Sequence, residues 1–149
     1  MSERLEYLLD TNLLSETRKK RADAGVLAFL EEAEATSLYI SVLTLGELRK
    51  GVAKKMRENA GEAQLLAGWV DGLQYSFAER ILGIDAGVAK LWGEWSSERP
   101  RPVVDTLLAA TAVRRGLTLV TRNLRDMQGI PVKLLNPWKE PPAVGPTAR

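Results

Sequence analysis

The chain has 149 residues, a net charge of +2, no cysteine and no histidine. A chain of this length can bury roughly two-thirds of its unfolded surface in one domain without disulfides. The missing cysteines exclude thiol nucleophiles and zinc ribbons, and the missing histidines exclude serine triads, His-ligated zinc and imidazole bases. Any hydrolytic chemistry must therefore rest on carboxylates, lysine or arginine, hydroxyl groups or a bound ion.

The sequence shows no pattern typical of a targeting segment or a membrane span. The N-terminus has no basic segment followed by a long apolar run, and no stretch approaches the roughly 18 apolar residues of a membrane span. We therefore expect a soluble, cytoplasmic protein that does not enter a membrane. Basic residues cluster within 18–21 and 49–57, where they either contact phosphates or form solvated helix faces.

Short apolar segments alternate with helical patterns along the chain. Buried strands are expected at residues 5–9, 38–42, 80–84, 117–121 and 132–135. Helices are expected at residues 23–36, from Thr44, at 62–77, after Asp85, and from Val104 to Gly116. The candidate caps of these helices are Asp23 and Asp85 at N-termini and Gly116 at a C-terminus.

This alternation predicts an α/β fold with a central, mainly parallel sheet of about four to five strands, covered by helices on both faces. We expect residues 1–138 to form a single domain. Residues 139–149 are rich in proline and poor in apolar side chains, so we expect a disordered tail there.

Four acidic residues fall at junctions between strands and the segments that follow them. Asp10 ends the first strand, before a polar turn and a helix-like pattern, whereas Glu47 and Asp105 lie in the first turns of helices. Asp126 comes five residues after the strand that ends at Thr121. Right-handed crossovers bring such junctions to one sheet edge, where four carboxylates repel unless a cation neutralises them. Mg²⁺ or Mn²⁺ prefers oxygen ligands and suits a site without histidine or cysteine.

Each acid also has a purely structural interpretation. Asp10 could cap the turn at Thr11 and Asn12, and Glu47 could close a capping box that begins at Thr44. Asp105 could interact with the helix dipole, and Asp126 could lie in a solvent-facing turn. Only the combination of the four favours a metal site over these alternatives. Glu16 falls one turn beyond Asp10 and could border the same pocket.

The segments around these acids resemble, in order and spacing, the motifs of PIN-domain nucleases. They are residues 8–12, 41–48, 105–112 and 119–126. Asn136-Pro137-Trp138 is similar to the FitB-like branch of the VapC toxins, so the resemblance covers nearly the whole chain up to Trp138. It implies a compact PIN-like α/β/α sandwich whose acidic residues hold Mg²⁺ or Mn²⁺ for cutting RNA.

The resemblance also implies roles for particular residues. By motif position the acidic constellation is Asp10, Glu47, Asp105 and Asp126, with Thr121 and Asn123 as neutral neighbours that orient water or ligands. Asp10 and Asp105 would be the most direct metal ligands, and the other two acids would bind through water or hold a second ion. Arg122 or Arg18 could grip the RNA backbone. Met127 departs from the family, which usually has an aromatic residue there, and we expect a change of packing only.

The leading hypothesis is a Mg²⁺- or Mn²⁺-dependent endoribonuclease that acts as the toxin of a type II toxin–antitoxin system. The family implies a cognate antitoxin that blocks the acidic pocket with an arginine and binds near residues 12–60. Apolar stripes with Trp69, Trp92 and Trp95 also suggest a homodimer, although each could instead be internal core.

Two other classes compete with this hypothesis. A non-catalytic PIN-like module would use the acidic pocket and basic face to bind nucleic acid or protein, and the complete acid set argues against it. A phosphatase with a strand-end Asp nucleophile is the third option. Aspartate-based phosphatases resemble Asp-x-Asp-x-Thr/Val at that position, and Asn12 and Leu14 do not fit the pattern.

Overall fold

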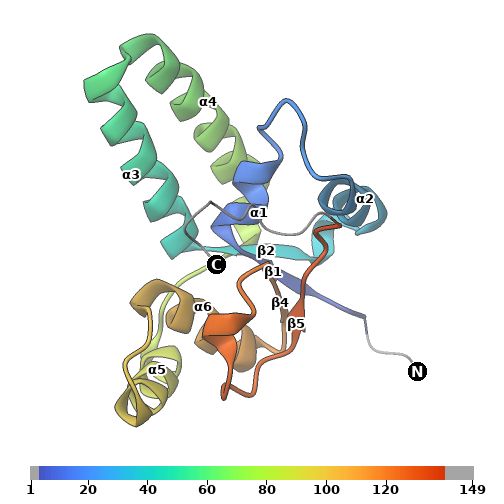
Figure 1. Cartoon of the computed structure of the whole chain (residues 1–149), viewed down its shortest axis with the longest axis vertical. Coiled ribbons are helices and arrows are strands. Elements are labelled where there is room, and N and C mark those ends of the chain that lie inside the picture. The colour runs from blue at the N-terminus through green and yellow to red at the C-terminus, as the bar shows by residue number, and fades with distance from the viewer. Residues whose placement is uncertain (1–3, 140–149) are drawn as a thin grey trace, which may run out of the picture.

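The computed structural model describes residues 4–139 of the chain (Figure 1). Within this range the sheet consists of β1 (Tyr7–Leu9), β2 (Leu38–Ser41), β3 (Ile81–Leu82), β4 (Thr118–Val120) and β5 (Leu134–Leu135). The α-helices of the same range are α1 (Thr11–Glu16), α2 (Ala24–Glu32), α3 (Val42–Glu58), α4 (Ala60–Ser76), α5 (Ala86–Glu98) and α6 (Val103–Arg115). No helix in the described range is long and apolar enough to cross a membrane.

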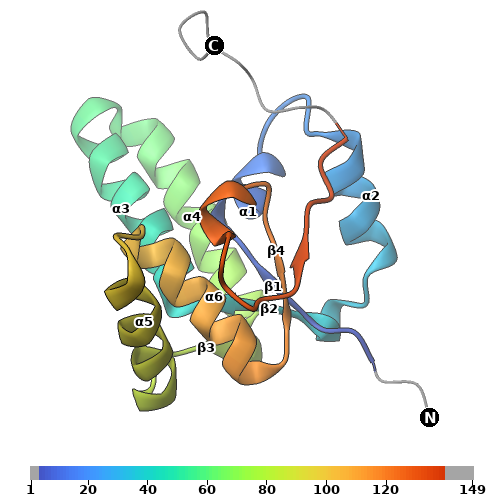
Figure 2. The ribbon, with the colours of Figure 1, turned by 60° about the horizontal axis from the view of Figure 1, so that its bottom comes forward.

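The five strands form a parallel sheet in the order β3-β2-β1-β4-β5. The chain moves in one direction from β1 to β3 and then crosses back over the sheet to β4. Right-handed crossovers place the helices of these two halves on opposite faces. Helices α1 to α4 accordingly lie on one side of the sheet and α5 and α6 on the other (Figures 1 and 2). The predicted α/β sandwich is confirmed, with a five-stranded sheet.

Two apolar cores sandwich the sheet because successive strand residues point to opposite faces. Leu8 of β1 and Leu119 of β4 belong to the core under α5 and α6, which also contains Met127. The next residues, Leu9 and Val120, belong to the core under α1 to α4. Met127 is 3% exposed and fills the core, in line with the expected change of packing only.

The start of α3 differs from the prediction. Ser41 is its N-cap, and the Ser41 hydroxyl accepts a hydrogen bond from the backbone N–H of Leu43. Serine at the strand end caps a helix as well as threonine does, so the helix opens at Val42 rather than at Thr44. The predicted capping box from Thr44 to Glu47 is therefore wrong, and the Glu47 carboxylate is available for other contacts.

Other predicted helix ends are largely confirmed. The Asp23 side chain accepts hydrogen bonds at the start of α2, Asp85 accepts one from Val88 N–H at the start of α5, and Gly116 ends α6 with φ of 69°. Helix α2 ends at Glu32 instead of continuing to residue 36. Its C-terminus is rich in glutamate, which opposes the negative end of the helix dipole.

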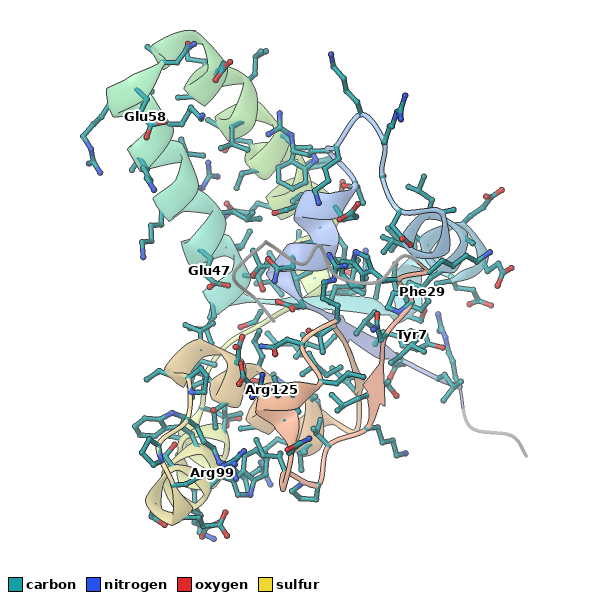
Figure 3. The ribbon with its side chains drawn as sticks, viewed as in Figure 1. Tyr7, Phe29, Glu47, Glu58, Arg99 and Arg125 are labelled. Carbon is teal, nitrogen blue, oxygen red and sulfur yellow. The ribbon has the colours of Figure 1, made fainter. Side chains whose placement is uncertain are left out.

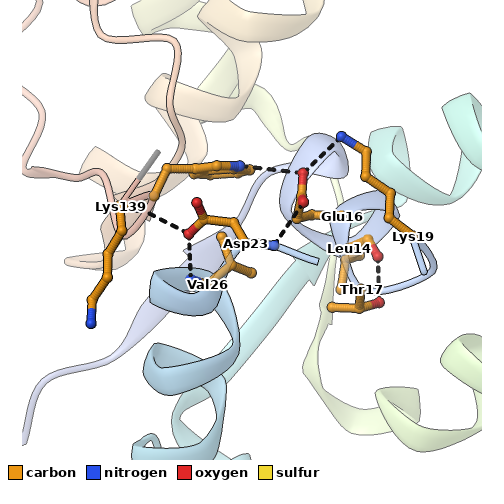
Figure 4. A network of polar contacts seen from close by, with 8 residues as sticks. Leu14, Glu16, Thr17, Lys19, Asp23, Val26 and Lys139 are labelled. Carbon is orange, nitrogen blue, oxygen red and sulfur yellow. Dashed lines mark hydrogen bonds and ion pairs between the residues drawn. The ribbon is translucent and has the colours of Figure 1, made fainter. Parts of the chain in front are cut away.

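The segment after β5 is fixed against α1 and α2. The Trp138 indole N–H donates to Glu16 Oε1 at 3.3 Å, and the Lys139 backbone N–H donates to Asp23 Oδ1 at 2.9 Å (Figure 4). Residues 140–149 lie outside the described residues, so the predicted disordered tail stays a prediction there.

Gly25 at the start of α2 makes a close approach to this segment. A Cβ atom at Gly25 would lie 2.0 Å from the Pro137 carbonyl oxygen and 2.9 Å from Lys139 N, so the backbone would have to shift. We expect Gly25→Ala to lower the free energy of unfolding by about 1–3 kcal/mol in urea denaturation, the usual cost of overpacking. Gly72→Ala in α4 is the matched control, because its Cβ meets open space. It should raise stability by about 0.5–1 kcal/mol, and equal effects of the two substitutions would contradict the close contact.

Candidate functional site

The candidate site lies where the strand order reverses. Asp10 follows β1, and Thr121 to Asn123 follow its neighbour β4. In open α/β sheets the crevice at the carboxyl ends of the strands beside such a reversal is the usual ligand site. The Asp10 backbone N–H donates to the Val120 carbonyl oxygen at 3.1 Å, so sheet pairing itself fixes the position of this acid.

The Asp10 carboxylate is only 6% exposed and faces β4. The Thr121 hydroxyl donates to Asp10 Oδ2 at 2.7 Å. Asp10 occupies the N-cap position of α1, and the N–H groups of Asn12 and Thr11 lie near its carboxylate, although no regular capping hydrogen bond forms. The contact with Thr121 goes beyond the capping alternative. Burial raises the pKa of Asp10 above its ordinary value, against the opposing effects of Thr121 and the nearby N–H groups of Asn12 and Thr11.

Glu47 reaches the site from α3, which lies beside α1 (Figure 3). The Thr11 hydroxyl is 2.6 Å from Glu47 Oε1, to which it donates, and 3.2 Å from the hydroxyl of the buried Thr44. Sequence reasoning missed this positioning role of Thr11 and assigned Thr44 to a cap. The available signal was the position of Thr11 directly after the strand-end acid Asp10.

Asn123 joins the two remaining acids. Its Nδ2 donates to Asp105 Oδ2 at 3.0 Å and to Asp126 Oδ2 at 2.9 Å. Its backbone N–H donates at 3.0 Å to the hydroxyl of Thr121, which in turn donates to Asp10. A single chain of hydrogen bonds therefore links three of the four acids through the two neutral residues, Thr121 and Asn123.

The four predicted acids lie close enough for their charges to interact. Burial raises the pKa of Asp105 above its ordinary value, and the negative charges of Asp10, Asp126 and Glu47 raise it further, in that order of size. Among the described residues, no lysine or arginine forms an ion pair with any of these four acids. Mutually repelling carboxylates without a protein counter-ion are suited to a cation with oxygen ligands.

The four carboxylates are positioned by hydrogen-bond donors rather than gathered around one point. Within residues 4–139, no three acidic side chains are arranged as a finished ligand set for a metal ion. Glu47 accepts from Thr11, and Asp105 and Asp126 share Asn123. The donor set fits Mg²⁺ or Mn²⁺ by its chemistry, and a bound ion would take over part of the neutralisation that these neutral donors now supply.

Glu16 does not join the four acids. Its carboxylate is buried and contacts Lys19 Nζ at 3.0 Å, the Asp23 backbone N–H at 2.9 Å and the Trp138 indole (Figure 4). Burial alone would raise its pKa, but the contacts with Lys19, Asp23 and Trp138 hold the pKa below its ordinary value. Glu16 therefore anchors the C-terminal segment and borders a neighbouring pocket of about 270 Å³.

The two arginines proposed to grip RNA both stack on tryptophans. The Arg122 guanidinium lies 4.9 Å from the Trp138 ring centroid, and that of Arg18 lies 5.2 Å from the Trp69 ring centroid. Such cation–π contacts hold both side chains against the protein surface.

The sequence and the fold match a known protein family. Residues 7–130 match the PIN domain family. The chain belongs to the PIN-domain family. The match extends from the start of β1 to just before β5, a range that includes all four acids.

Individual relatives place this PIN domain near the FitB and VapC proteins. It is 31% identical over 139 residues to the toxin FitB of Neisseria gonorrhoeae, covering 89% of this chain and 99% of FitB. It is 27% identical over 144 residues to the VapC ribonuclease Y4jK of Sinorhizobium fredii, covering 89% and 97%. The crystal structure of FitAcB from Neisseria gonorrhoeae superposes with a TM-score of 0.80 at 30% identity, covering 90% and 99%. The resemblance to the FitB-like branch is confirmed.

Proposed function

We propose that this PIN domain is a Mg²⁺- or Mn²⁺-dependent endoribonuclease that acts as the toxin of a type II toxin–antitoxin pair. The observation that carries the proposal is the set of four mutually repelling carboxylates at the reversal point of the sheet. The names of the relatives, a toxin and a ribonuclease, support RNA as the substrate and toxicity as the role.

The four acids would bind the metal in different ways. Asp10 is buried at the strand end, and Asp105 lies near the charges of the other three acids, so these two would hold the ion directly. Glu47 and Asp126 would act through water or hold a second ion. When bound, the ion would activate water and stabilise charge on the leaving oxygen of a phosphodiester.

Other residues of the site would orient the four acids. Thr121 and Asn123 keep Asp10, Asp105 and Asp126 in fixed orientations, as outer hydrogen-bond partners of metal ligands usually do. The chain has no histidine, so the base for the attacking water would be supplied either by a carboxylate of the site or through the bound ion. Thr11 orients Glu47 toward the same edge.

The partner in this proposal is an antitoxin protein that covers the acidic edge with a cationic side chain. The four acids have no counter-ion among the described residues, and an inserted arginine would provide one. A homodimer stays a prediction as well. Trp95 is buried in the core, whereas Leu65 and Tyr75 on α4 are 72% and 86% exposed and leave apolar surface for such a contact.

Metal binding can be measured apart from cleavage by thermal unfolding. At a Mn²⁺ concentration 100 times the dissociation constant, we expect about 2.7 kcal/mol of stabilisation, or roughly 5–10 °C in Tm. The same titration with Asp10→Asn should show little shift, because one direct ligand is lost. Cleavage of a single-stranded RNA, followed on a gel, should require Mg²⁺ or Mn²⁺ and stop on addition of EDTA.

The same experiments separate the enzyme from a non-catalytic binding module. A binding module would bind RNA or protein without any Tm response to Mn²⁺ and without cleavage. Cleavage at the full rate in EDTA, by protein shown free of contaminating nuclease, would contradict the metal mechanism.

A further inference from the structure

A second polar pocket shares a wall with the carboxylate site. Its volume is about 340 Å³, and it is lined by the loop 99–102 together with Arg125, Asp126 and Gln128. Asp126 also accepts a hydrogen bond from Asn123 and so belongs to both sites. We call this hollow, with its guanidinium groups from Arg99, Arg101 and Arg125, the arginine pocket.

The arginine pocket carries more positive charge than its surroundings neutralise. Arg99 and Arg101 both donate to the same acceptor, the Gln128 carbonyl oxygen, each at 3.1 Å. Within residues 4–139, the only ion pair of Arg101 is a 3.9 Å contact with the exposed Glu98. The Arg125 side chain forms no hydrogen bond or ion pair with any residue in the described part of the chain, although its backbone carbonyl accepts from Gln128 N–H.

Donor groups remain available in this pocket. A guanidinium has five N–H donors, and Arg101, whose side chain is 4% exposed, uses its Nε on the Trp95 carbonyl oxygen and its NH1 on Gln128. Arg99 uses one nitrogen, and Arg125 uses none. Figure 3 shows Arg99 and Arg125 on the α5 and α6 side of the molecule.

The backbone around the pocket also favours an anion. Pro100 and Pro102 fix φ on both sides of Arg101, which reduces the entropy lost when the loop holds a ligand. Helix α6 begins at the rim, where Pro102 is the N-cap and no side chain caps the first turn. The positive end of the helix dipole therefore adds to the field of the three guanidinium groups.

We propose that the arginine pocket binds a backbone phosphate of single-stranded RNA that flanks the scissile phosphodiester. The inference rests on the proposed nuclease function and adds the path of the substrate, from the carboxylates over Asp126 into the pocket. Arginine forks match phosphate oxygens, whereas a phosphate contact carries no base information. The pocket therefore sets affinity and register of the RNA and leaves sequence choice to other contacts.

The test uses RNA binding in an Asp10→Asn background, which prevents cleavage during the measurement. Fluorescence anisotropy with a labelled single-stranded RNA should show about tenfold weaker binding for Arg99→Ala/Arg125→Ala. The slope of log K against log salt should fall by about 0.7, the value for one phosphate on a single strand. The matched control is Lys90→Ala/Lys133→Ala, which removes the same charge from exposed positions outside the pocket lining and should change affinity by less than about twofold.

A second measurement replaces single backbone phosphates of the RNA with a neutral methylphosphonate. At one position next to the cleavage site, this substitution should weaken RNA binding by the Asp10→Asn protein. The same substitution should not weaken RNA binding by the protein that also carries the arginine double substitution.

Equal losses of RNA affinity in the arginine variant and the control variant would contradict phosphate binding in the arginine pocket. Weaker antitoxin binding with unchanged RNA binding would also overturn it and assign the pocket to protein docking. If wild-type protein cleaves RNA and the arginine variant keeps its KM, only the pocket fails, whereas wild-type protein that neither binds nor cleaves RNA removes the proposed function itself.

Discussion

Asp10→Asn and Asp105→Asn should each reduce RNA cleavage by at least about a thousandfold, because direct metal ligands contribute several kcal/mol at about 1.4 kcal/mol per factor of ten. Asparagine has the same shape as aspartate, and the Thr121 hydroxyl still finds an oxygen at position 10. The loss therefore reports missing charge rather than missing structure. Initial rates of cleavage in saturating Mn²⁺ measure it.

The same variants should be more stable than the wild type when metal is removed. The pKa values of Asp10 and Asp105 are raised in the folded protein, so the folded state holds these protons more tightly than the unfolded chain. This contribution to stability is complete below the ordinary pKa of 3.8 and is lost as the pH rises through the folded pKa. At neutral pH the charged pair therefore destabilises the metal-free fold.

Urea denaturation in EDTA can check the sign of this effect. The gain in stability of Asp105→Asn over the wild type should be larger at pH 7.5 than at pH 4, where the wild-type carboxyls take up protons. A variant that is less stable than the wild type at pH 7.5 would show that the carboxylate contributes to the fold, and lost cleavage would then carry no information on mechanism. Full cleavage by folded Asp10→Asn would overturn the proposed mechanism.

Local sequence rules predicted the five strands, each of which is shorter than the expected range, and most helix caps. Asp10 follows a short apolar run that suits a strand better than a helix, and Gly116 reaches the positive φ that ends α6, so both positions follow from short-range chemistry. The start of α3 was predicted two residues late, because Ser41 and Thr44 are both acceptable caps. Tertiary contact decides between them, since the Thr44 hydroxyl lies 3.2 Å from that of Thr11.

The acids of the candidate site could also be predicted from local patterns, whereas the contacts between them could not. The acids could be identified from their positions after strands, because parallel pairing brings those ends together. The network that orients them depends on side-chain contacts between residues far apart in the chain, such as Asp10 with Thr121 and Thr11 with Glu47. No local pattern contains these distances. The arginine pocket likewise needs the loop before α6 to meet Arg125, a contact that periodicity does not predict.

Asn123→Ala should weaken cleavage by about 10–100-fold, the usual cost of losing an outer partner of metal ligands. The substitution removes the amide that separates Asp105 from Asp126, so the two carboxylates face each other without a donor between them. Their repulsion raises the pKa of Asp105 further, and a metal ion must then order both side chains as it binds. We expect the Mn²⁺ concentration for half-maximal cleavage to rise, with part of the rate recovered at saturating Mn²⁺.

Gln64→Ala is the matched control, because it removes an exposed amide on α4 and should leave this Mn²⁺ concentration unchanged. Loss of rate with an unchanged Mn²⁺ dependence would show that Asn123 acts on the RNA or on the fold instead of on the acids.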